Sequence, residues 1–316
     1  MIELIKQAAP AICGYIRRTP MEKSLPLSEI LGTEVYLKCE HLQVTGSFKI
    51  RGACFRLLQM TAEEKKKGVL SCSAGNHGKA LAYMSQKLGI KATIFVPSQV
   101  DPSKLAGIIA YGAEVIRAPC IGYDETEHLA KDEARMRGIP FISPFDDDCV
   151  MAGNGGTLAM EIIKDVPDVK MILTPVGGGG LCAGLCCVVN DHNPTIQVIG
   201  CQHEGSPALH LSLQRGEAVT QLPPFKTLAA GVEGGIGARC FDLIKSRIAG
   251  CCLVDEDSII DAVRWCLKHH QYLIEPSAAV TLAAILNGKV GDVKGPIVVI
   301  LSGRNVSIES VKEILR

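Results

Sequence analysis

Short apolar segments alternate with longer amphipathic segments along most of this chain, and this alternation limits its possible folds more than any other feature. The segments with the composition of buried strands are residues 69–73, 92–97, 114–117, 141–143, 171–176, 197–200 and 297–301. Most stretches between them carry apolar residues at helical spacing. Buried strands separated by helices predict parallel sheets that helices cover on both faces.

The sequence therefore predicts an α/β fold with two open, mainly parallel sheets. With 316 residues and 47% hydrophobic content, the chain can bury cores of that size. We expect domain boundaries near residues 68 and 146, so that a small α/β domain (68–146) is inserted into a larger domain (1–67 and 147–316). The Gly- and Pro-containing stretch 214–237 is predicted to be a long loop.

Charge and hydropathy exclude several classes of partner. The 33 Lys and Arg residues balance 33 Asp and Glu residues. No basic run is interleaved with aromatic side chains, so we expect neither nucleic acid nor a membrane as a partner. No apolar run reaches the length of a membrane span, and no secretory signal is visible at Met1. We therefore expect a soluble, cytoplasmic protein.

The chain has 14 cysteines and no C-x-x-C pair. Cys182, Cys186 and Cys187 cluster on a segment predicted to be a buried helix. Iron–sulfur ligands are one interpretation of this cluster. Cysteine in a buried helix behaves as a small hydrophobic residue, however, and we predict buried thiols instead.

Lys49 is the strongest candidate for a reactive side chain. It lies between a strand-like segment, 35–39, and a helix-like segment, 53–59, with apolar Phe48 and Ile50 on either side. Partial desolvation disfavours an ammonium group and frees the amine as a nucleophile. A surface lysine that opens a helix is the ordinary alternative.

Two small-residue loops follow predicted strands and precede predicted helices. The first contains Ser73, Ala74, Gly75, Asn76 and His77, and the second contains Gly177, Gly178, Gly179, Gly180 and Leu181. Free backbone N–H groups at a helix N-terminus bind a carboxylate or phosphate. Taken alone, the first loop is more typical of an ordinary helix cap, with Ser73 or Asn76 as the capping residue. Four consecutive glycines carry a backbone entropy cost, which favours a phosphate-binding role for the second.

Two further candidates lie near the end of the chain. Ser302 ends a predicted buried strand, where ligands collect in open parallel sheets, and its hydroxyl can bond a ring nitrogen or cap a helix. Glu275 begins a predicted helix, where a carboxylate is favourable with or without a functional role.

Together, in their order along nearly the whole chain, these motifs resemble the fold-type II, or tryptophan synthase β-like, family of pyridoxal-phosphate (PLP) enzymes. Ser47–Ala53 resembles that family's Schiff-base lysine motif, with Lys49 as the lysine. The 73–77 loop resembles its substrate-carboxylate loop, and Gly177–Leu181 its phosphate loop. The resemblance also implies cofactor contacts from Phe48, from Asn76, and from Ser302 to the pyridine nitrogen.

Within the family, the chain is most similar to catabolic serine/threonine dehydratases and serine racemase. The resemblance implies a PLP-dependent ammonia-lyase that converts L-threonine or L-serine to a 2-oxo acid and ammonia. It also implies a homo-oligomer, expected to be a dimer. Lys49 would hold the cofactor and then take the α-proton of the substrate.

Departures from the family pattern bear on the substrate. The resemblance implies that racemases of this family have a serine, which donates a proton, at the position of Ala74. Alanine has no proton to give, so Ala74 favours elimination over racemisation. Gln202, Ser206 and Ala208 stand where the racemase-type metal site has acidic residues, so we assign no metal ligand and leave a divalent cation open.

Arg304 replaces a usual glycine, and we hypothesise that it binds a second carboxylate, as in 3-hydroxyaspartate. Residues 154–157 look one residue out of step with the family pattern.

Two alternatives come from other classes. The run Gly178, Gly180 and Ala183 matches a dinucleotide fingerprint weakly, which would suit a nicotinamide-dependent oxidoreductase. A cofactor-binding protein without catalysis would keep the glycines as well. Neither explains all four motifs.

Overall fold

The computed structural model describes residues 1–100, 102–291 and 293–316. The larger of its two sheets is six-stranded, and only β1 is antiparallel to its neighbour. In spatial order its strands are β1 (Met21–Lys23), β2 (Val35–Lys38), β9 (Ile297–Ile300), β6 (Met171–Pro175), β7 (Gln197–His203) and β8 (Gly250–Val254). The smaller sheet is parallel and consists of β3 (Val69–Cys72), β4 (Ala92–Val96) and β5 (Glu114–Arg117).

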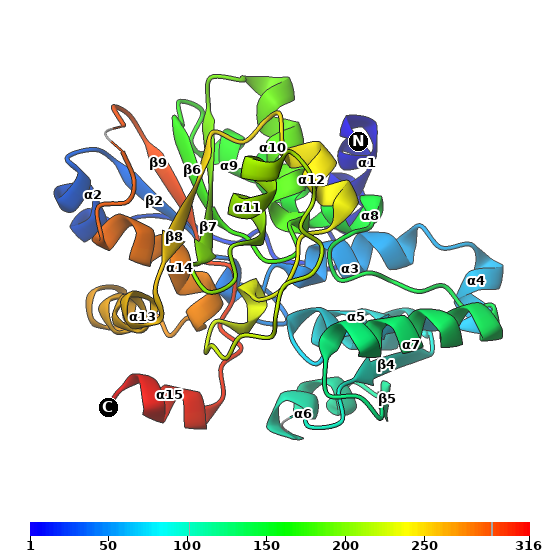
Figure 1. Ribbon diagram of the computed structural model, residues 1–316. Helices are drawn as coiled ribbons and strands as arrows, with labels where there is room; N and C mark the ends of the chain where they lie inside the picture. The colour runs from blue at the N-terminus through cyan, green and yellow to red at the C-terminus, as the bar shows by residue number, and fades with distance from the viewer. Residues whose placement is uncertain (101, 292) are drawn as a thin grey trace.

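Helices cover both sheets, as the alternation predicted (Figure 1). Those belonging to the six-stranded part are α1 (Ile2–Ile12), α2 (Leu25–Leu31), α3 (Lys49–Leu58), α8 (Asp148–Met151), α9 (Thr157–Asp165), α10 (Gly180–His192), α11 (Ala208–Arg215), α12 (Ala238–Ile244), α13 (Glu256–His270), α14 (Pro276–Leu286) and α15 (Ile308–Ile314). Those around the three-stranded sheet are α4 (Ala62–Lys67), α5 (Asn76–Leu88), α6 (Pro102–Ala110) and α7 (Tyr123–Arg137). Single turns are η1 (Glu40–Leu42), the π-helical turn η2 (Ala152–Gly156) and η3 (Ala230–Val232).

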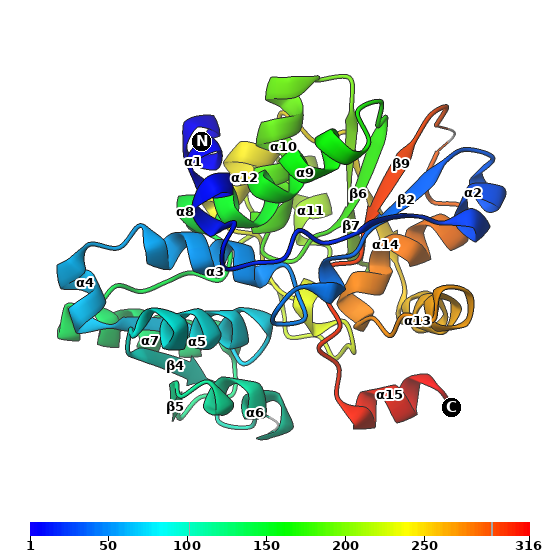
Figure 2. The same ribbon diagram turned by 180° about the vertical axis from the view of Figure 1, so that it is seen from behind.

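Alternating strand residues divide the interior of the six-stranded sheet into two cores. Leu37, Leu173 and Val299 pack with α13 and α14, whereas Ile172 and Val198 pack with α1, α9, α10 and α12 on the other face. These two helix layers lie on opposite sides of the sheet (Figure 2). A sheet covered on both faces needs apolar residues at nearly every strand position, which is why β6 and β9 are buried throughout.

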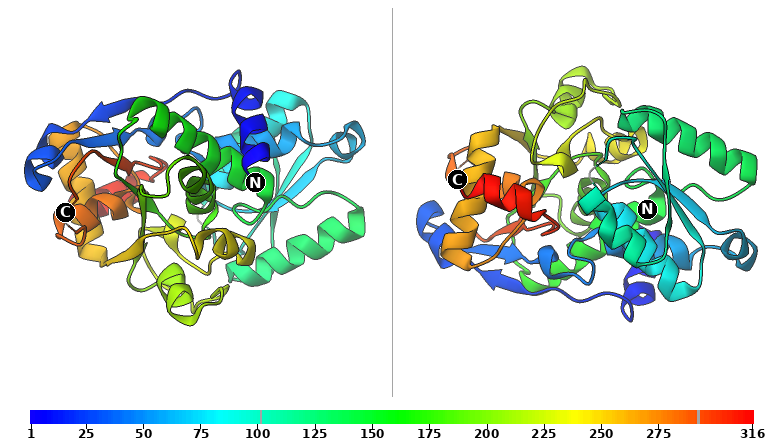
Figure 3. Two further views of the ribbon diagram at one scale, coloured as in Figure 1. Left: turned by 90° about the horizontal axis from the view of Figure 1, so that it is seen from above. Right: turned by 90° about the horizontal axis from the view of Figure 1, so that it is seen from below.

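Helix α3 joins the two sheets through a common core. Its Ile50 and Phe55 belong to the same apolar cluster as Leu81 of α5 and Ile94 of β4. The three-stranded sheet lies at one end of the molecule and the C-terminal helix α15 lies at the other, beside α13 (Figure 3). The candidate site lies where α3, α5 and the six-stranded sheet meet.

The prediction of a strand over residues 141–143 was wrong. This segment forms one isolated bridge, between Phe141 and Leu70, and does not extend the small sheet. Pro140 and Pro144 flank the segment and provide no N–H group, so the ladder cannot continue in either direction. The predicted domain boundaries near residues 68 and 146 stay a prediction.

Candidate active site

Lys49 is the first residue of α3 and points toward the segment that follows Ile142. Its Nζ donates a hydrogen bond to the carbonyl oxygen of Pro144 at 2.7 Å and lies 5.2 Å from the ring centroid of Phe48. Burial lowers the pKa of Lys49 to about 8, while the nearby groups of Cys240 and Glu275 act in the opposite direction. An appreciable fraction of this amine is therefore neutral, and nucleophilic, near neutral pH.

The Lys49 motif is joined to the end of β9. Ser47 and Gly303 form an antiparallel bridge, and the N–H of Phe48 donates to the carbonyl oxygen of Ser302 at 3.1 Å. Ser302 is only 3% exposed. The Lys49 motif and the Ser302 motif are thus in direct contact, although Lys49 and Ser302 are 253 residues apart in the chain.

Glu275 is a site residue whose role the sequence left open. It precedes α14, is 7% exposed, and accepts hydrogen bonds from Asn76 Nδ2 at 2.7 Å and from the backbone N–H of Asn305 at 3.1 Å. Asn305 Nδ2 in turn donates to Asn76 Oδ1 at 2.6 Å. Burial raises the pKa of Glu275 to about 7, against hydrogen bonds that favour its ionised form. The signal available in the sequence was a carboxylate directly before a predicted helix.

The loop 73–77 connects β3 to α5 and faces the same region. Ser73 and Ala74 are partly buried, Gly75 is exposed, and the N–H of Gly75 donates to Ser73 Oγ at 3.3 Å. His77 is 2% exposed, and neither ring nitrogen has a hydrogen-bond partner among the described residues. Burial, with the charge of Lys49, lowers the pKa of His77 to about 3.

The glycine loop approaches the Lys49 region from the other side. A Cβ on Gly178 would lie 2.3 Å from Cγ of Phe145. Phe145 directly follows Pro144, whose carbonyl oxygen accepts the hydrogen bond from Lys49. A Cβ on Gly177 would lie 2.6 Å from the carbonyl oxygen of Gly231. Gly179 has φ +93°, which L side chains rarely adopt. The turn into α10 thus requires glycine, and Leu181 anchors it in the core at 5% exposure.

The site cluster consists of Lys49, Asn76, Glu275, Ser302 and the loop 177–181. Other candidates from the sequence lie outside this cluster, or hydrogen-bond to the backbone elsewhere in the fold. Gln202 Nε2 donates to the carbonyl oxygen of Val176 at 3.2 Å, and Ser206 Oγ accepts from the N–H of Gly234 at 2.9 Å. Cys182 and Cys186 are buried in α10 with their sulfurs 3.9 Å apart. Within residues 1–100, 102–291 and 293–316, no three His, Cys, Asp or Glu side chains are arranged to hold a metal ion.

Arg304 lies on the loop after Ser302 and is exposed. Its N–H donates to the carbonyl oxygen of Gly46 at 2.9 Å. Burial and the charge of Arg304 both lower the pKa of Lys79, whose Nζ donates to Asn305 Oδ1 at 2.8 Å. Arg304 therefore adds positive charge beside the hydrogen-bonded group of Asn76, Glu275 and Asn305.

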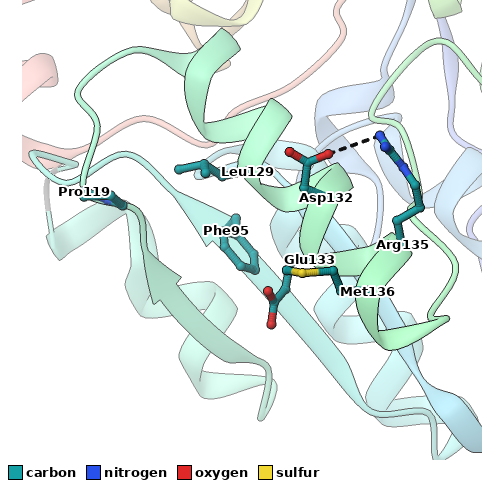
Figure 4. Close-up of a pocket in the computed structure, with 7 residues that line it drawn as sticks. All are labelled: Phe95, Pro119, Leu129, Asp132, Glu133, Arg135 and Met136. Carbon is teal, nitrogen blue, oxygen red and sulfur yellow. Dashed lines mark ion pairs between the residues drawn. The ribbon is translucent and has the colours of Figure 1, made fainter.

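A surface hollow of about 580 Å³ lies away from these motifs, between β4 and α7 (Figure 4). It is lined by Phe95, Pro119, Leu129, Asp132, Glu133, Arg135 and Met136. Its charged residues include an exposed ion pair, Asp132 with Arg135, at 3.2 Å. None of its lining residues belongs to a predicted site motif.

The residues of the cluster fit a phosphorylated aldehyde cofactor. Such a group needs a neutral amine, a phosphate cradle without side chains and a polar partner for a ring nitrogen. Lys49 has a lowered pKa, Cβ atoms on Gly177 and Gly178 would collide with their surroundings, and Ser302 adjoins Phe48. The cluster thus has the features of a PLP site.

Comparison with known proteins agrees with this chemistry. The family model for pyridoxal-phosphate dependent enzymes matches residues 12–303, and the chain belongs to that family. L-threonine ammonia-lyase of Geobacter sulfurreducens is 38% identical over 313 residues, which are 99% of this chain and 77% of that protein. Serine racemase of Dictyostelium discoideum is 38% identical over 314 residues, 98% of this chain and 96% of that protein.

Solved structures show the same fold. The crystal structure of the Dictyostelium discoideum serine racemase superposes with a TM-score of 0.90 at 36% identity and covers 98% of this chain and 99% of that one. The crystal structure of the T.th. threonine deaminase superposes with a TM-score of 0.89 at 35% identity, covering 97% and 99%. The fold-type II resemblance and the predicted α/β fold are confirmed, and the nicotinamide interpretation of the glycine run is not supported.

Proposed function

We propose that this protein is a PLP-dependent ammonia-lyase that converts a β-hydroxy amino acid, such as L-threonine or L-serine, to a 2-oxo acid and ammonia. The observation that carries the proposal is the position of buried Lys49, whose motif contacts the end of β9. Its amine also bonds Pro144, which directly precedes the Phe145 side chain that lies against Gly178. Relatives named threonine ammonia-lyase and threonine dehydratase, at 34–38% identity over nearly the whole chain, support the reaction.

The cofactor would be held by three groups of residues. Lys49 would bind its aldehyde carbon through the amine, with Phe48 beside it, and the N–H groups of Gly177, Gly178, Gly179, Gly180 and Leu181 would surround its phosphate. Ser302 would bond the pyridine nitrogen, and Asn76 the phenolic oxygen. Once bound, PLP supplies an electron sink for negative charge at the α-carbon of the substrate.

The chain's own residues would then position the amino acid and move protons. Backbone and side-chain donors of Ser73, Ala74, Gly75, Asn76 and His77 would hold the substrate carboxylate at the start of α5. The Lys49 amine, neutral near its pKa of about 8, would accept the α-proton. A hydroxyl at Ser302, which carries no charge, would leave the ring nitrogen unprotonated and favour prompt loss of the β-hydroxyl group.

Racemisation is the second candidate, because the serine racemase of Dictyostelium discoideum is as similar as the lyases. It would need a proton donor on the face opposite Lys49. Ala74 has no such proton. We therefore place elimination first. A 3-hydroxyaspartate dehydratase is the third candidate, and the exposed Arg304 beside Asn305 favours it over a strictly monocarboxylic substrate.

The test is an absorption spectrum of the purified protein with PLP, followed by 2-oxo acid detection with L-serine, L-threonine and 3-hydroxyaspartate. We expect a visible band and oxo acid production, both lost in Lys49→Ala. Lys245→Ala, which removes an exposed lysine paired with Asp242, serves as the control and should keep both. Accumulation of the D-enantiomer without oxo acid would favour the racemase. A band that persists in Lys49→Ala would refute the assignment of this lysine.

Arg304→Gly separates the substrate candidates. If Arg304 binds a second carboxylate, the variant should lose preference for 3-hydroxyaspartate over serine by about tenfold or more, since charge-assisted bonds contribute roughly 1.5–3 kcal/mol. An unchanged preference would refute this role.

None of the described helices is long and apolar enough to cross a membrane. A cytoplasmic location and a homodimer stay predictions.

A further inference from the structure

Two cysteines face each other across the last two strands of the six-stranded sheet. Cys201 of β7 is the register partner of Cys252 of β8, and both side chains contact the core on the α13–α14 face. Neighbouring strands lie about 4.8 Å apart. That spacing is within the roughly 4.4–6.8 Å that separates Cα atoms joined by a disulfide.

The two thiols differ in access and in acidity. Cys201 is fully buried, whereas Cys252 is partly exposed and its Sγ donates to the carbonyl oxygen of Lys289 at 3.2 Å. The neighbouring thiol of Cys201 lowers the pKa of Cys252 to about 7, against the effect of burial and together with the charge of Lys289. Cys252 is therefore the member of the pair that combines solvent access with the lower pKa, and its thiolate, once the proton is released, is the form that oxidants attack.

Cys252 lies on an edge strand of the six-stranded sheet. β8 is the terminal strand in the observed order, so only β7 is hydrogen-bonded to it. Cys182 and Cys186, whose sulfurs are 3.9 Å apart, are both buried within one helix and offer no exposed thiol. Cys251 points to the opposite face, where its Sγ donates to Gln202 Oε1 at 3.7 Å.

We propose that Cys201 and Cys252 form a redox-modification site, at which a hydroperoxide converts the thiol pair to a reversible disulfide. The Cys252 thiolate attacks the peroxide oxygen, forming a sulfenic acid and releasing hydroxide, which a proton converts to water. The Cys201 sulfur then displaces the sulfenic hydroxyl group, forming the S–S bond and a second water. In total, two thiols and one hydrogen peroxide give one disulfide and two waters.

The position of the pair connects it to the glycine loop. The N–H of Val176, directly before Gly177, donates to the carbonyl oxygen of Cys201 at 3.0 Å. The next residue, Gln202, also donates to the carbonyl oxygen of Val176. The disulfide would therefore form in the strand segment that supports the entrance to the glycine loop.

The test treats reduced, PLP-loaded protein with one equivalent of hydrogen peroxide, blocks free thiols with N-ethylmaleimide and maps peptides without reduction. We expect a Cys201–Cys252 cross-linked peptide, lighter than the two thiol peptides by two hydrogens and reversed by dithiothreitol. Cys252→Ser should abolish it. Cys251→Ser, the matched control on the opposite face, should keep it.

A second variant separates the two chemical steps. In Cys201→Ala the sulfenic acid has no partner, so dimedone should label Cys252 in this variant severalfold more than in the parent protein. Equal dimedone labelling in both, or oxidation of Cys252 to sulfinic acid in the parent without a cross-link, would refute the proposal. Melting curves followed by circular dichroism check that each variant is folded.

Discussion

Glu275 is held between two opposing effects at the scale of a single residue. Burial disfavours its charge, whereas Asn76 and the N–H of Asn305 both donate to it and favour the carboxylate. Burial prevails, and the pKa is about 7 instead of 4.5. The folded protein therefore keeps a proton on Glu275 over a pH range in which the unfolded chain has released it.

This raised pKa gives stability a definite pH dependence. The contribution of Glu275 is fully present below pH 4.5 and decreases as the pH rises through about 7, by roughly 3 kcal/mol for a shift of this size. The free energy of unfolding of the parent protein minus that of Glu275→Gln should therefore decrease between pH 5 and pH 8. Urea titrations at several pH values measure it.

The difference between the two proteins removes those titrations that do not involve Glu275. His41 and His77 have lowered pKa values, of about 4 and about 3, and destabilise the fold as the pH falls below 6.5. Both proteins share these histidines, so their effect cancels. Glu309→Gln, on the exposed first turn of α15, is the control and should show no pH-dependent difference. A flat difference for Glu275→Gln would show that its pKa is not raised.

At the scale of elements, α10 packs closely on the turn η2. Residues 152–156 form a π-helical turn, which accommodates one extra residue in a helix. A Cβ on Gly184 of α10 would lie 2.4 Å from the carbonyl oxygen of Met151 and 2.5 Å from the N of Gly156. Both atoms are backbone, so only separation of the two elements could make room.

Gly184→Ala should therefore destabilise the protein. Alanine improves helix propensity by about 1 kcal/mol, but overpacking against backbone costs about 1–3 kcal/mol or more. We expect a net loss in the free energy of unfolding, measured by urea titration. Gly14→Ala, where a Cβ meets nothing within 4 Å, is the control and should change stability by less than about 0.5 kcal/mol. A stabilised Gly184→Ala would contradict the close packing.

At the scale of the whole molecule, a buried ion network joins distant parts of the chain around α3. Arg51 is fully buried and donates to both oxygens of Glu40, at 2.8 Å each, and to both oxygens of Glu161, at 2.7 and 2.9 Å. Lys38 of β2 also donates to Glu161, at 2.6 Å. The charge of Arg51 lowers the pKa of Glu40 despite its burial. Two cations thus balance two carboxylates beneath the helix that begins with Lys49.

Arg51→Met should destabilise the protein by about 3–5 kcal/mol, because it leaves Glu40 buried without its cation. Chemical denaturation measures the loss. The stability of Arg51→Lys should lie between that of the parent protein and that of Arg51→Met, because lysine keeps the charge but not the bidentate hydrogen bonds. Arg239→Met is the control. Its ion pair with Asp148 is about half exposed on both sides, so we expect a change within about 1 kcal/mol. Equal effects at Arg51 and Arg239 would contradict the role of burial.

Local composition was sufficient to predict the parallel sheets and the separate motifs. Strands buried on both faces, such as β4 and β6, are continuous apolar runs that can be recognised without their neighbours. Half-exposed β8 and the short antiparallel β1 were missed because edge strands lack that signal. The sequence did not predict the helix α11 either, and the predicted loop 214–237 overlaps its last residues.

Contacts between distant residues were decided only by the tertiary structure. Asn76 and Glu275 are 199 residues apart, and Arg51 and Glu161 are 110 apart, so no local pattern marks either pair. Burial of the two side chains in the folded protein is the main cause of the shifted pKa values of Lys49 and Glu275, so composition does not predict them. The sequence determines which chemical groups end each strand, whereas the packing of α3 between the two sheets decides which of them meet.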